Sequence, residues 1–257
     1  MSMLAQVGQM ARRSILQTLR QPAMVIPPIV FPLLLVSINA AGLDAATKLP
    51  GFPTDSYWDF AIAVPFVQGA LFSALNAGTA MARDVETGFL KRLAMTPMQR
   101  TALLLGHLTG VMVVAFFSAC VYLAAGFVAG MDFKAGAGGI PVIIALGMMI
   151  SLAFAGLGSF IGLRAGSGEA VQGFFPLLFV MLFLSSINLP RPLIEQDWFR
   201  TIATYNPASY LVEGIRSLII TGWDGHALAL GFGVSAAVAA VGIGGATVAL
   251  RTRLVRT

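Results

Sequence analysis

Charged residues are scarce in this chain: Asp, Glu, Lys and Arg together make up 11% of its 257 residues, whereas hydrophobic residues make up 57%. A soluble globular protein carries about 25% charged residues, because they cover much of its water-exposed surface. Disordered chains are excluded as well, since they are poor in apolar residues. The composition therefore indicates an integral membrane protein and argues against a soluble enzyme.

Several patterns that carry chemistry are absent from the sequence. The single cysteine, Cys120, lies in an apolar run, so there is neither an intrachain disulfide nor a cysteine cluster for a metal ion. His107 and His226 lie far apart and form no HExxH pattern, and none of the three lysines follows a glycine, so no P-loop exists. We expect no catalytic residue, metal or cofactor on this chain; if it takes part in active transport, the energy must come from another polypeptide.

Charge is also missing from places where transporters and nucleic-acid-binding proteins need it. No apolar run contains a central carboxylate, which argues against a secondary transporter or a proton-driven pump. The net charge is +5, but the 16 Lys and Arg residues are spread along the chain in short clusters rather than gathered in one patch. We therefore expect membrane lipid, and no nucleic acid, as a partner.

Six apolar runs are long enough to cross a bilayer, which requires about 20 apolar residues per helix. They cover residues 24–43, 60–82, 102–130, 140–163, 171–189 and 226–250. Over residues 3–20, apolar positions recur every three or four residues opposite glutamines and arginines, which predicts an amphipathic helix in the membrane interface. The sequence thus predicts an all-α membrane protein, with one transmembrane domain over residues 1–257.

Proline and glycine mark two special features of the predicted helices. Pro27, Pro28 and Pro32 interrupt the hydrogen-bond ladder of the first span, so we expect a kinked helix whose freed carbonyls are satisfied by neighbouring helices. Glycines recur in the fourth and sixth spans, where they predict close helix packing. They are Gly156, Gly158, Gly162, Gly242, Gly244 and Gly245.

Positive charge is distributed unevenly between the segments that join the spans. The side that holds both termini carries 11 Lys and Arg residues, and the other side carries 5. By the positive-inside rule the first side is cytoplasmic. We therefore expect a multi-pass protein of the plasma (inner) membrane with both termini in the cytoplasm, a cytoplasmic segment over residues 83–100 and an external segment over residues 190–225.

The cytoplasmic segment over residues 83–100 reads RDVETGFLKRLAMTPMQR. Acidic residues precede a positive cluster, an order that favours a helix through its macrodipole. Apolar residues at spacings of three and four form one side, and Pro97 ends the segment. The pattern predicts a short amphipathic helix parallel to the membrane, although a solvated positive loop would share this composition.

Two motifs resemble those of a known family. Glu86-Thr87-Gly88-Phe89-Leu90-Lys91-Arg92-Leu93, followed by Thr96-Pro97, is similar to the E-x-G-T-x-x-x-L-x-x-T/S-P loop of type-two ATP-binding-cassette (ABC) exporter permeases, with Thr and Gly in the reverse order. The stretch from Asn206-Pro207 to Arg216 resembles the family's external N-P-x-x-x-x-x-x-x-x-R stretch. The family also has an interfacial helix before the first of six spans.

The resemblance implies a half-transporter that pairs with itself or a paralogue and with two separate ABC ATPase subunits, which would bind ATP and Mg. It makes residues 83–100 a coupling helix, with Leu90 and Leu93 as anchors buried in the ATPase. The expected coupling residues are Arg83, Asp84, Glu86, Thr87, Gly88, Phe89, Leu90, Lys91, Arg92, Leu93 and Pro97. The external segment would be a re-entrant hairpin with functional residues Asn206, Pro207, Glu213 and Arg216, in which Glu213 and Arg216 are spaced to pair on a helix.

Polar and aromatic residues form one stripe on the second span and another on the fifth. The two stripes contain Gln68, Phe72, Asn76 and Thr79, and Gln172, Phe175, Phe179 and Ser186. They could line a substrate path between two protomers, or they could pack helices together through amides and hydroxyls. With 18 Phe, 12 Met and no charge inside the spans, such a path would suit an apolar or amphipathic solute.

The sequence and the resemblance together lead us to expect the permease subunit of an ATP-driven ABC exporter. It would move a drug or lipid out of the cytoplasm by alternating access. Two alternatives stay open at this point: a permease that exports a polysaccharide or glycolipid, and a membrane assembly protein that transports nothing.

Overall fold

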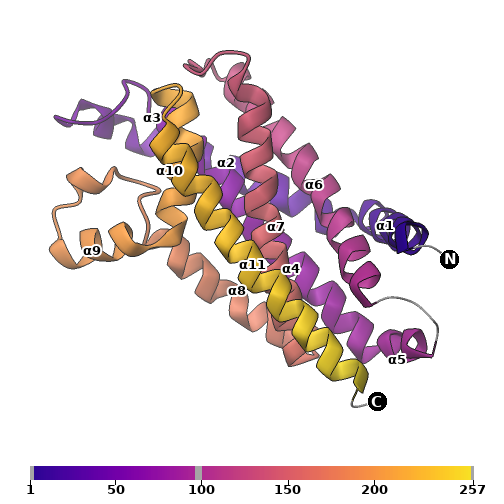
Figure 1. Cartoon of the computed structure of the whole chain (residues 1–257). Helices are drawn as coiled ribbons and strands as arrows, with labels where there is room; N and C mark the ends of the chain where they lie inside the picture. The colour runs from indigo at the N-terminus through magenta and orange to yellow at the C-terminus, as the bar shows by residue number, and fades with distance from the viewer. Residues whose placement is uncertain (1–2, 96–99, 256–257) are drawn as a thin grey trace.

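The computed structural model describes residues 3–95 and 100–255, and in these ranges the chain forms helices and no strands (Figure 1). The elements in chain order are α1 (Met3–Leu19), α2 (Pro22–Leu43), η1 (Asp44–Lys48), α3 (Tyr57–Ala61), α4 (Val64–Glu86), α5 (Phe89–Ala94), α6 (Arg100–Val128), α7 (Gly139–Ala165), α8 (Gly168–Phe183), η2 (Arg191–Leu193), α9 (Asp197–Tyr205), α10 (Pro207–Ile220) and α11 (Gly225–Val255). The long helices run together as one bundle. α5 and the C-terminus lie at one end, which we call the α5 end, and α3 and the loop before α7 lie toward the other.

Within residues 3–95 and 100–255, five helical stretches are long and apolar enough to cross a membrane, which confirms the predicted all-α membrane fold. They are Pro22–Lys48, Tyr57–Glu86, Ala102–Val128, Gly139–Ala165 and Gly225–Arg253. The expected span over residues 171–189 is instead α8, an apolar helix of 16 residues. At 1.5 Å per residue α8 is about 24 Å long, shorter than the ~30 Å hydrocarbon core.

The early end of α8 has a specific cause in the later part of the chain. The Nδ2 atom of Asn206 donates hydrogen bonds to the carbonyls of Met181 and Leu184, at 2.6 and 3.1 Å, and so satisfies the last turn of α8. The Oδ1 atom of Asn206 accepts from the N–H of Ala208 at 2.9 Å and caps α10. One amide side chain therefore closes one helix and starts another.

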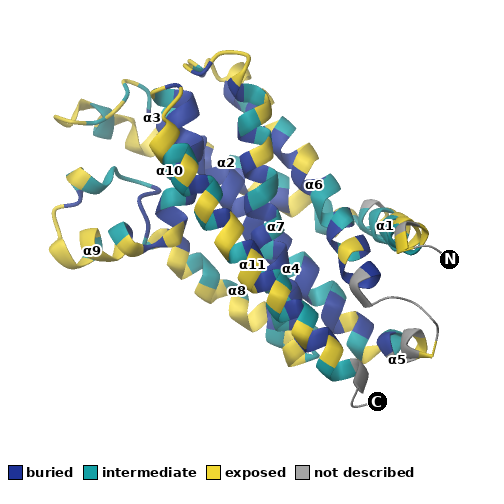
Figure 2. Cartoon of the chain, viewed as in Figure 1, coloured by how far each residue is buried: buried dark blue, intermediate teal, exposed yellow. Residues whose placement is uncertain are grey.

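The core of the bundle lies along α4 and α7 (Figure 2). A Cβ atom added at Gly158 would lie 1.9 Å from the carbonyl oxygen of Ala74, and one at Gly162 would lie 2.1 Å from that of Gly78. The two backbones thus touch, as the glycines predicted. In α11, Gly242 approaches Leu157 in the same way, whereas Gly244 has nothing within 4 Å and its predicted packing role is wrong.

Two further helices attach to this core in different ways. α1 packs against the first turns of α6, where a Cβ atom at Gly110 would lie 2.1 Å from the Oγ atom of Ser14. α10 is buried over most of its length and packs against α11, α3 and α7. The segment before it, α9, is largely exposed and lies beside the bundle (Figure 2).

Candidate functional site

The segment expected to couple to an ATPase lies at the α5 end of the bundle and contains two helices rather than one. α4 continues to Glu86, Gly88 adopts a left-handed φ of 68°, and α5 covers only Phe89–Ala94. Gly88 breaks the helix expected over residues 83–100, because glycine takes this conformation without a steric penalty. The side chains of Lys91 and Leu93, and the whole of Pro97, lie outside what the structure describes.

An ion pair joins this segment to α1. The guanidinium of Arg13 donates hydrogen bonds of 2.9 and 3.3 Å to the carboxylate of Asp84, which is buried. The same guanidinium lies 4.0 Å above the ring of Phe89. Asp84 and Phe89 therefore serve contacts within the chain, although both were expected to face a partner. Sequence reasoning missed Arg13, because charge on the polar face of a helix does not reveal its partner.

A second contact joins the segment to the loop between α7 and α8. The Oε1 atom of Glu86 accepts a hydrogen bond of 3.0 Å from the N–H of Gly168, at the first turn of α8. Ser167 caps the same helix by accepting from the N–H of Ala170. Negative charge at a helix N-terminus is favourable, so Glu86 also complements the α8 dipole. The end of α4 is thus fixed to α1 on one side and to α8 on the other.

Leu90 is the clearest correction in this segment. Its side chain is 4% exposed and belongs to an apolar cluster with Met81, Leu103 and Leu104 of the same chain. The motif led us to expect that Leu90 seats in a groove of the ATPase. Because its side chain is already buried within this chain, it is not available for that contact. The side chain of Met95, which the motif did not single out, is 89% exposed directly after α5.

The outward surface at this end is positively charged and includes one apolar residue. Arg83, Thr87 and Arg92 are exposed beside Met95, and Glu86 is exposed although it bonds to Gly168. We call Arg83, Thr87, Arg92 and Met95 the α5 surface. A protruding methionine within a rim of arginines is suited to seat in an apolar hollow with an acidic rim.

The aromatic residues of the two predicted stripes come together between α2, α4 and α8. The ring centroids of Phe72 and Phe175 lie 5.3 Å apart, as do those of Phe175 and Phe179. Phe31 of α2, which the stripes did not include, lies 5.8 Å from Phe72, and Phe183 lies 5.9 Å from Phe179. We call these five residues the phenylalanine cluster. It is open on one side, because Phe31 and Phe183 are 40% and 46% exposed.

The polar residues of the stripes do not surround this cluster. Gln68 is buried, and its Oε1 atom has no hydrogen-bond partner in the described part of the chain. Thr79 donates to the carbonyl of Leu75 in its own helix, at 2.8 Å. Gln172 is exposed near the start of α8, and Ser186 lies beyond its end. The two stripes therefore share their aromatic residues but not their polar ones.

Asn76 has a structural task at the prolines of α2. Pro28 has no N–H to bond the carbonyl of Met24, and the Nδ2 atom of Asn76 donates to that oxygen at 2.9 Å. Pro32 likewise leaves the carbonyl of Pro28 without its helical partner, and the hydroxyl of Tyr122 donates to it. The expectation that neighbouring helices satisfy these carbonyls is confirmed at both positions.

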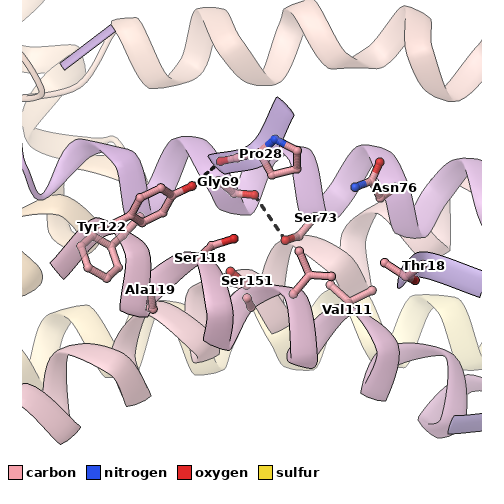
Figure 3. A pocket seen from close by; sticks show the side chains of 14 residues that line it. Thr18, Pro28, Gly69, Ser73, Asn76, Val111, Ser118, Ala119, Tyr122 and Ser151 are labelled. Atoms are coloured by element: carbon pink, nitrogen blue, oxygen red, sulfur yellow. Dashed lines mark hydrogen bonds between the residues drawn. The ribbon is translucent and has the colours of Figure 1, made fainter. Parts of the chain in front are cut away.

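A small cavity, lined by apolar groups and several hydroxyls, lies beside these prolines, between α2, α4, α6 and α7 (Figure 3). Its volume is about 30 Å³, and the hydroxyls of Ser73, Ser118, Tyr122 and Ser151 are among the groups that line it. A buried water needs about 10–15 Å³, so the cavity has room for about two waters. It is far smaller than the roughly 300–1,000 Å³ of a small-molecule site, and it therefore provides no path for a drug-sized solute through one protomer.

The N-P-…-R stretch joins three segments at the end of the bundle opposite α5, through its last residue, Arg216. Arg216 is buried and donates to the carbonyls of Phe60, Ser186 and Ile187, at 2.9, 3.1 and 3.1 Å. Its guanidinium also lies 3.5 Å above the ring of Phe60. Arg216 therefore holds α10 against both α3 and the segment after α8.

The expected pair between Glu213 and Arg216 is wrong. Both oxygens of Glu213 accept from Arg191 of η2, and Oε1 also accepts from the hydroxyl of Ser186 at 2.7 Å. Burial lowers the pKa of the Arg191 guanidinium, but the hydrogen bonds and charge of Glu213 outweigh it, and the net pKa is raised. Arg191 comes from outside the helix, so the spacing within α10 could not reveal it.

Comparisons with known proteins show which proteins the chain is similar to. The family model described as "ABC-2 type transporter" matches residues 5–220. The chain is 29% identical over 171 residues to "Daunorubicin resistance ABC transporter permease protein DrrB1" of Streptomyces coeruleorubidus, covering 65% of this chain and 59% of that protein. It is 29% identical over 229 residues to "Putative transport permease ycf38" of Pyropia yezoensis, covering 84% of this chain and 75% of that protein.

Proposed function

Because the chain belongs to the ABC-2 type transporter family, we propose that this ABC transporter permease exports an apolar or amphipathic solute, a drug or a lipid, from the cytoplasm. Permeases of this family work with ABC ATPase subunits. Two such subunits would bind ATP and Mg and drive a pair formed by this chain and a second copy or a paralogue. The α5 end, with both termini, would face the cytoplasm of a plasma (inner) membrane.

The α5 surface is the proposed contact with the ATPase. Its support is geometric: Met95 protrudes beside Arg83 and Arg92, and α4 behind them is fixed to α1 by Arg13 and to α8 by Glu86. A displacement of this surface by the ATPase would therefore be transmitted directly to α4, α1 and α8. Alternating access needs such rigid-body movement of packed helices.

The phenylalanine cluster is the proposed wall of the substrate path. It supports an apolar or amphipathic solute because it presents aromatic rings without a charged group among its five members. The cavity beside the prolines of α2 is too small for such a solute, which favours a path between two permeases. The relative named for daunorubicin resistance supports a drug over a polysaccharide.

The exposed Met95 within its arginine rim is the observation that carries this proposal, and ATP-dependent association tests it. The full chain would be purified in mild detergent and any co-purifying polypeptide labelled with azido-ATP. We expect labelled ATPase with the native chain and with Arg251→Glu, an exposed control on α11, and its loss in Met95→Asp. Equal labelling with Met95→Asp would refute the contact, and reproducible absence of any ATP-binding polypeptide would favour the assembly protein.

Transport itself is tested in proteoliposomes that contain the permease and its ATPase. We expect ATP-dependent movement of the amphipathic dye rhodamine 6G, blocked by Phe31→Trp, which adds bulk at the open side of the phenylalanine cluster. Phe116→Trp, an exposed position on α6, is the matched control. If both variants transport alike, the cluster is not the path.

A further inference from the structure

A second and larger cavity lies at the end of the bundle opposite α5. It has a volume of about 340 Å³ and is bounded by α10, the first turns of α11, η2 and the loop at Pro53. This volume is in the range of small-molecule sites. None of the five phenylalanines of the cluster lines it, so it is distinct from the proposed substrate path.

Exposed aromatic residues close in the chain to α10 and α11 indicate that this part of the protein lies near the boundary between membrane and water. Trp223, which immediately precedes the cavity residue Asp224, is 60% exposed, and Trp198 and Tyr205 of α9 are exposed as well. Tryptophan and tyrosine concentrate at the level of lipid headgroups. The walls also include the apolar side chains of Ile220 and Leu230. A ligand that enters here therefore meets a polar mouth next to apolar walls.

One part of the cavity carries guanidinium groups. Arg191 donates two hydrogen bonds to Glu213 and one to the carbonyl of Thr204, and it also interacts with Tyr210, so not all five N–H donors of the guanidinium are used. Arg216 likewise donates three, all to carbonyls, and adds a second positive charge. Glu213 balances only one of these charges. This part of the cavity can therefore still attract a phosphate group.

Another part offers acceptors. The Oδ1 atom of Asp224 accepts from the N–H groups of His226 and Ala227, at 3.0 and 3.1 Å, and caps α11. Its Oδ2 atom has no partner among the residues that the structure describes. The hydroxyl of Thr221 donates to the carbonyl of Ser217 at 2.9 Å and keeps its lone pairs. A ligand here must bring donors and a positive charge.

We propose that this cavity binds the headgroup of a phospholipid that carries both a phosphate and a primary ammonium group, as in phosphatidylethanolamine. Arg191 and Arg216 attract the phosphate, and Asp224 and Thr221 accept from the ammonium. The two arginines and the two carboxylates balance, so neither an anionic nor a cationic headgroup matches the lining. In the orientation proposed above this lipid belongs to the external leaflet, but the site does not depend on transport.

The preference for a primary over a quaternary ammonium follows from the same contacts. A quaternary group has no N–H to donate and is held by open aromatic faces. Tyr210 is the aromatic residue of the lining, and the guanidinium of Arg191 already lies 4.4 Å above its ring. Choline headgroups therefore lack their usual partner here, whereas an ethanolamine group finds free acceptors.

Lipid-dependent thermal stability of the purified full chain tests the site. Phosphatidylethanolamine, phosphatidylcholine and phosphatidylglycerol with identical short acyl chains would be added in turn, with glycerophosphoethanolamine as the soluble headgroup. We expect a rise in melting temperature that is largest with phosphatidylethanolamine and weak with the soluble headgroup. Equal rises with the three lipids overturn the proposal. An equal effect of the soluble headgroup overturns the lipid assignment in favour of a soluble solute.

Asp224→Asn isolates the charge, because Asn caps a helix as well as Asp does. We expect about tenfold weaker binding of phosphatidylethanolamine, since a charge-assisted hydrogen bond becomes a neutral one, while the melting temperature in the absence of lipid falls only slightly, through the lost charge at the N-terminus of α11. Asp55→Asn, an exposed residue outside the lining, is the matched control. Ala227→Leu would reduce the cavity volume and should abolish binding. Undiminished affinity in both Asp224→Asn and Ala227→Leu would refute the site.

Discussion

The guanidinium of Arg13 and the carboxylate of Asp84, 71 positions apart in the sequence, form a pair of hydrogen bonds that ties α1 to α4 just before α5 begins. A helix at the edge of the bundle is thereby joined to the segment that we propose as the ATPase contact. Movement of this segment has to carry α1 with it or break the pair. The two helices therefore form one mechanical unit.

Loss of this ion pair should destabilise the protein. Asp84 is buried, so Arg13→Ala leaves a carboxylate without its partner, and we expect a loss of about 1–3 kcal/mol in the free energy of unfolding. Arg12→Ala, at the exposed neighbouring position, should change it by less than about 0.5 kcal/mol. Thermal unfolding of both variants in one detergent makes the comparison, and equal effects would show that the pair contributes nothing specific.

Leu90 and Met95 should respond in opposite ways. Leu90→Ala removes buried methyl groups from an apolar cluster and should lower the free energy of unfolding by about 2–5 kcal/mol. Met95→Ala changes an exposed side chain and should leave stability unchanged while weakening ATPase binding. Melting temperature and ATPase co-purification would be measured for each variant. A stable Leu90→Ala protein that loses its ATPase would restore Leu90 as the anchor.

The hydroxyl of Tyr122 should matter for stability although it lies among apolar helices. Tyr122→Phe leaves the carbonyl of Pro28 without its donor, and an unsatisfied buried acceptor costs about 1–3 kcal/mol. Tyr205→Phe is the control, because that side chain is 81% exposed. A melting temperature of Tyr122→Phe that matches the control would mean that water replaces the lost donor.

Two glycine substitutions should separate packing from helix propensity. Gly158→Ala would place a methyl group against the carbonyl of Ala74 and force α4 and α7 apart, so we expect a loss of about 1–3 kcal/mol. Gly244→Ala meets nothing within 4 Å and should be neutral or stabilising by up to about 1 kcal/mol. Unfolding of the two variants in parallel provides the check, and a neutral Gly158→Ala would contradict the close approach.

Three features could be predicted from sequence: the long apolar spans, the packing glycines of α7 and the satisfied carbonyls at the prolines of α2. The first two depend on local composition, and the third follows from the N–H that proline lacks. The length of α8 could not, since its last turn is closed by Asn206, whose position becomes relevant only after the chain has folded back. Two serines and an asparagine follow soon after Phe183, at positions 185, 186 and 188, so the sequence weakens the apolar run there without fixing the residue at which the helix ends.

In the candidate sites too, local sequence patterns could be predicted, whereas contacts between distant segments could not. Phe175 and Phe179 share a face of α8 because their spacing follows the helix period, whereas Phe31 of α2 contacts Phe179 and Phe72 without a signal of its own in the sequence. Leu90 illustrates the limit of a motif, because burial in the same chain and burial in a partner select the same residue type. Arg191 likewise replaced Arg216 as the partner of Glu213 from a turn outside the helix.

The hydrogen bonds of Arg216 also constrain the order in which the segments of the chain come together during synthesis. Its guanidinium relies on the carbonyls of Phe60, Ser186 and Ile187, and an arginine without such partners is strongly disfavoured in an apolar surrounding. The residues that provide these carbonyls are all synthesised before Arg216, so its binding place is ready when α10 emerges from the ribosome. The contacts of Arg216 can therefore form only once α3 and the segment after α8 are in place, and we expect a defect at either to leave the Arg216 guanidinium without its acceptors during synthesis.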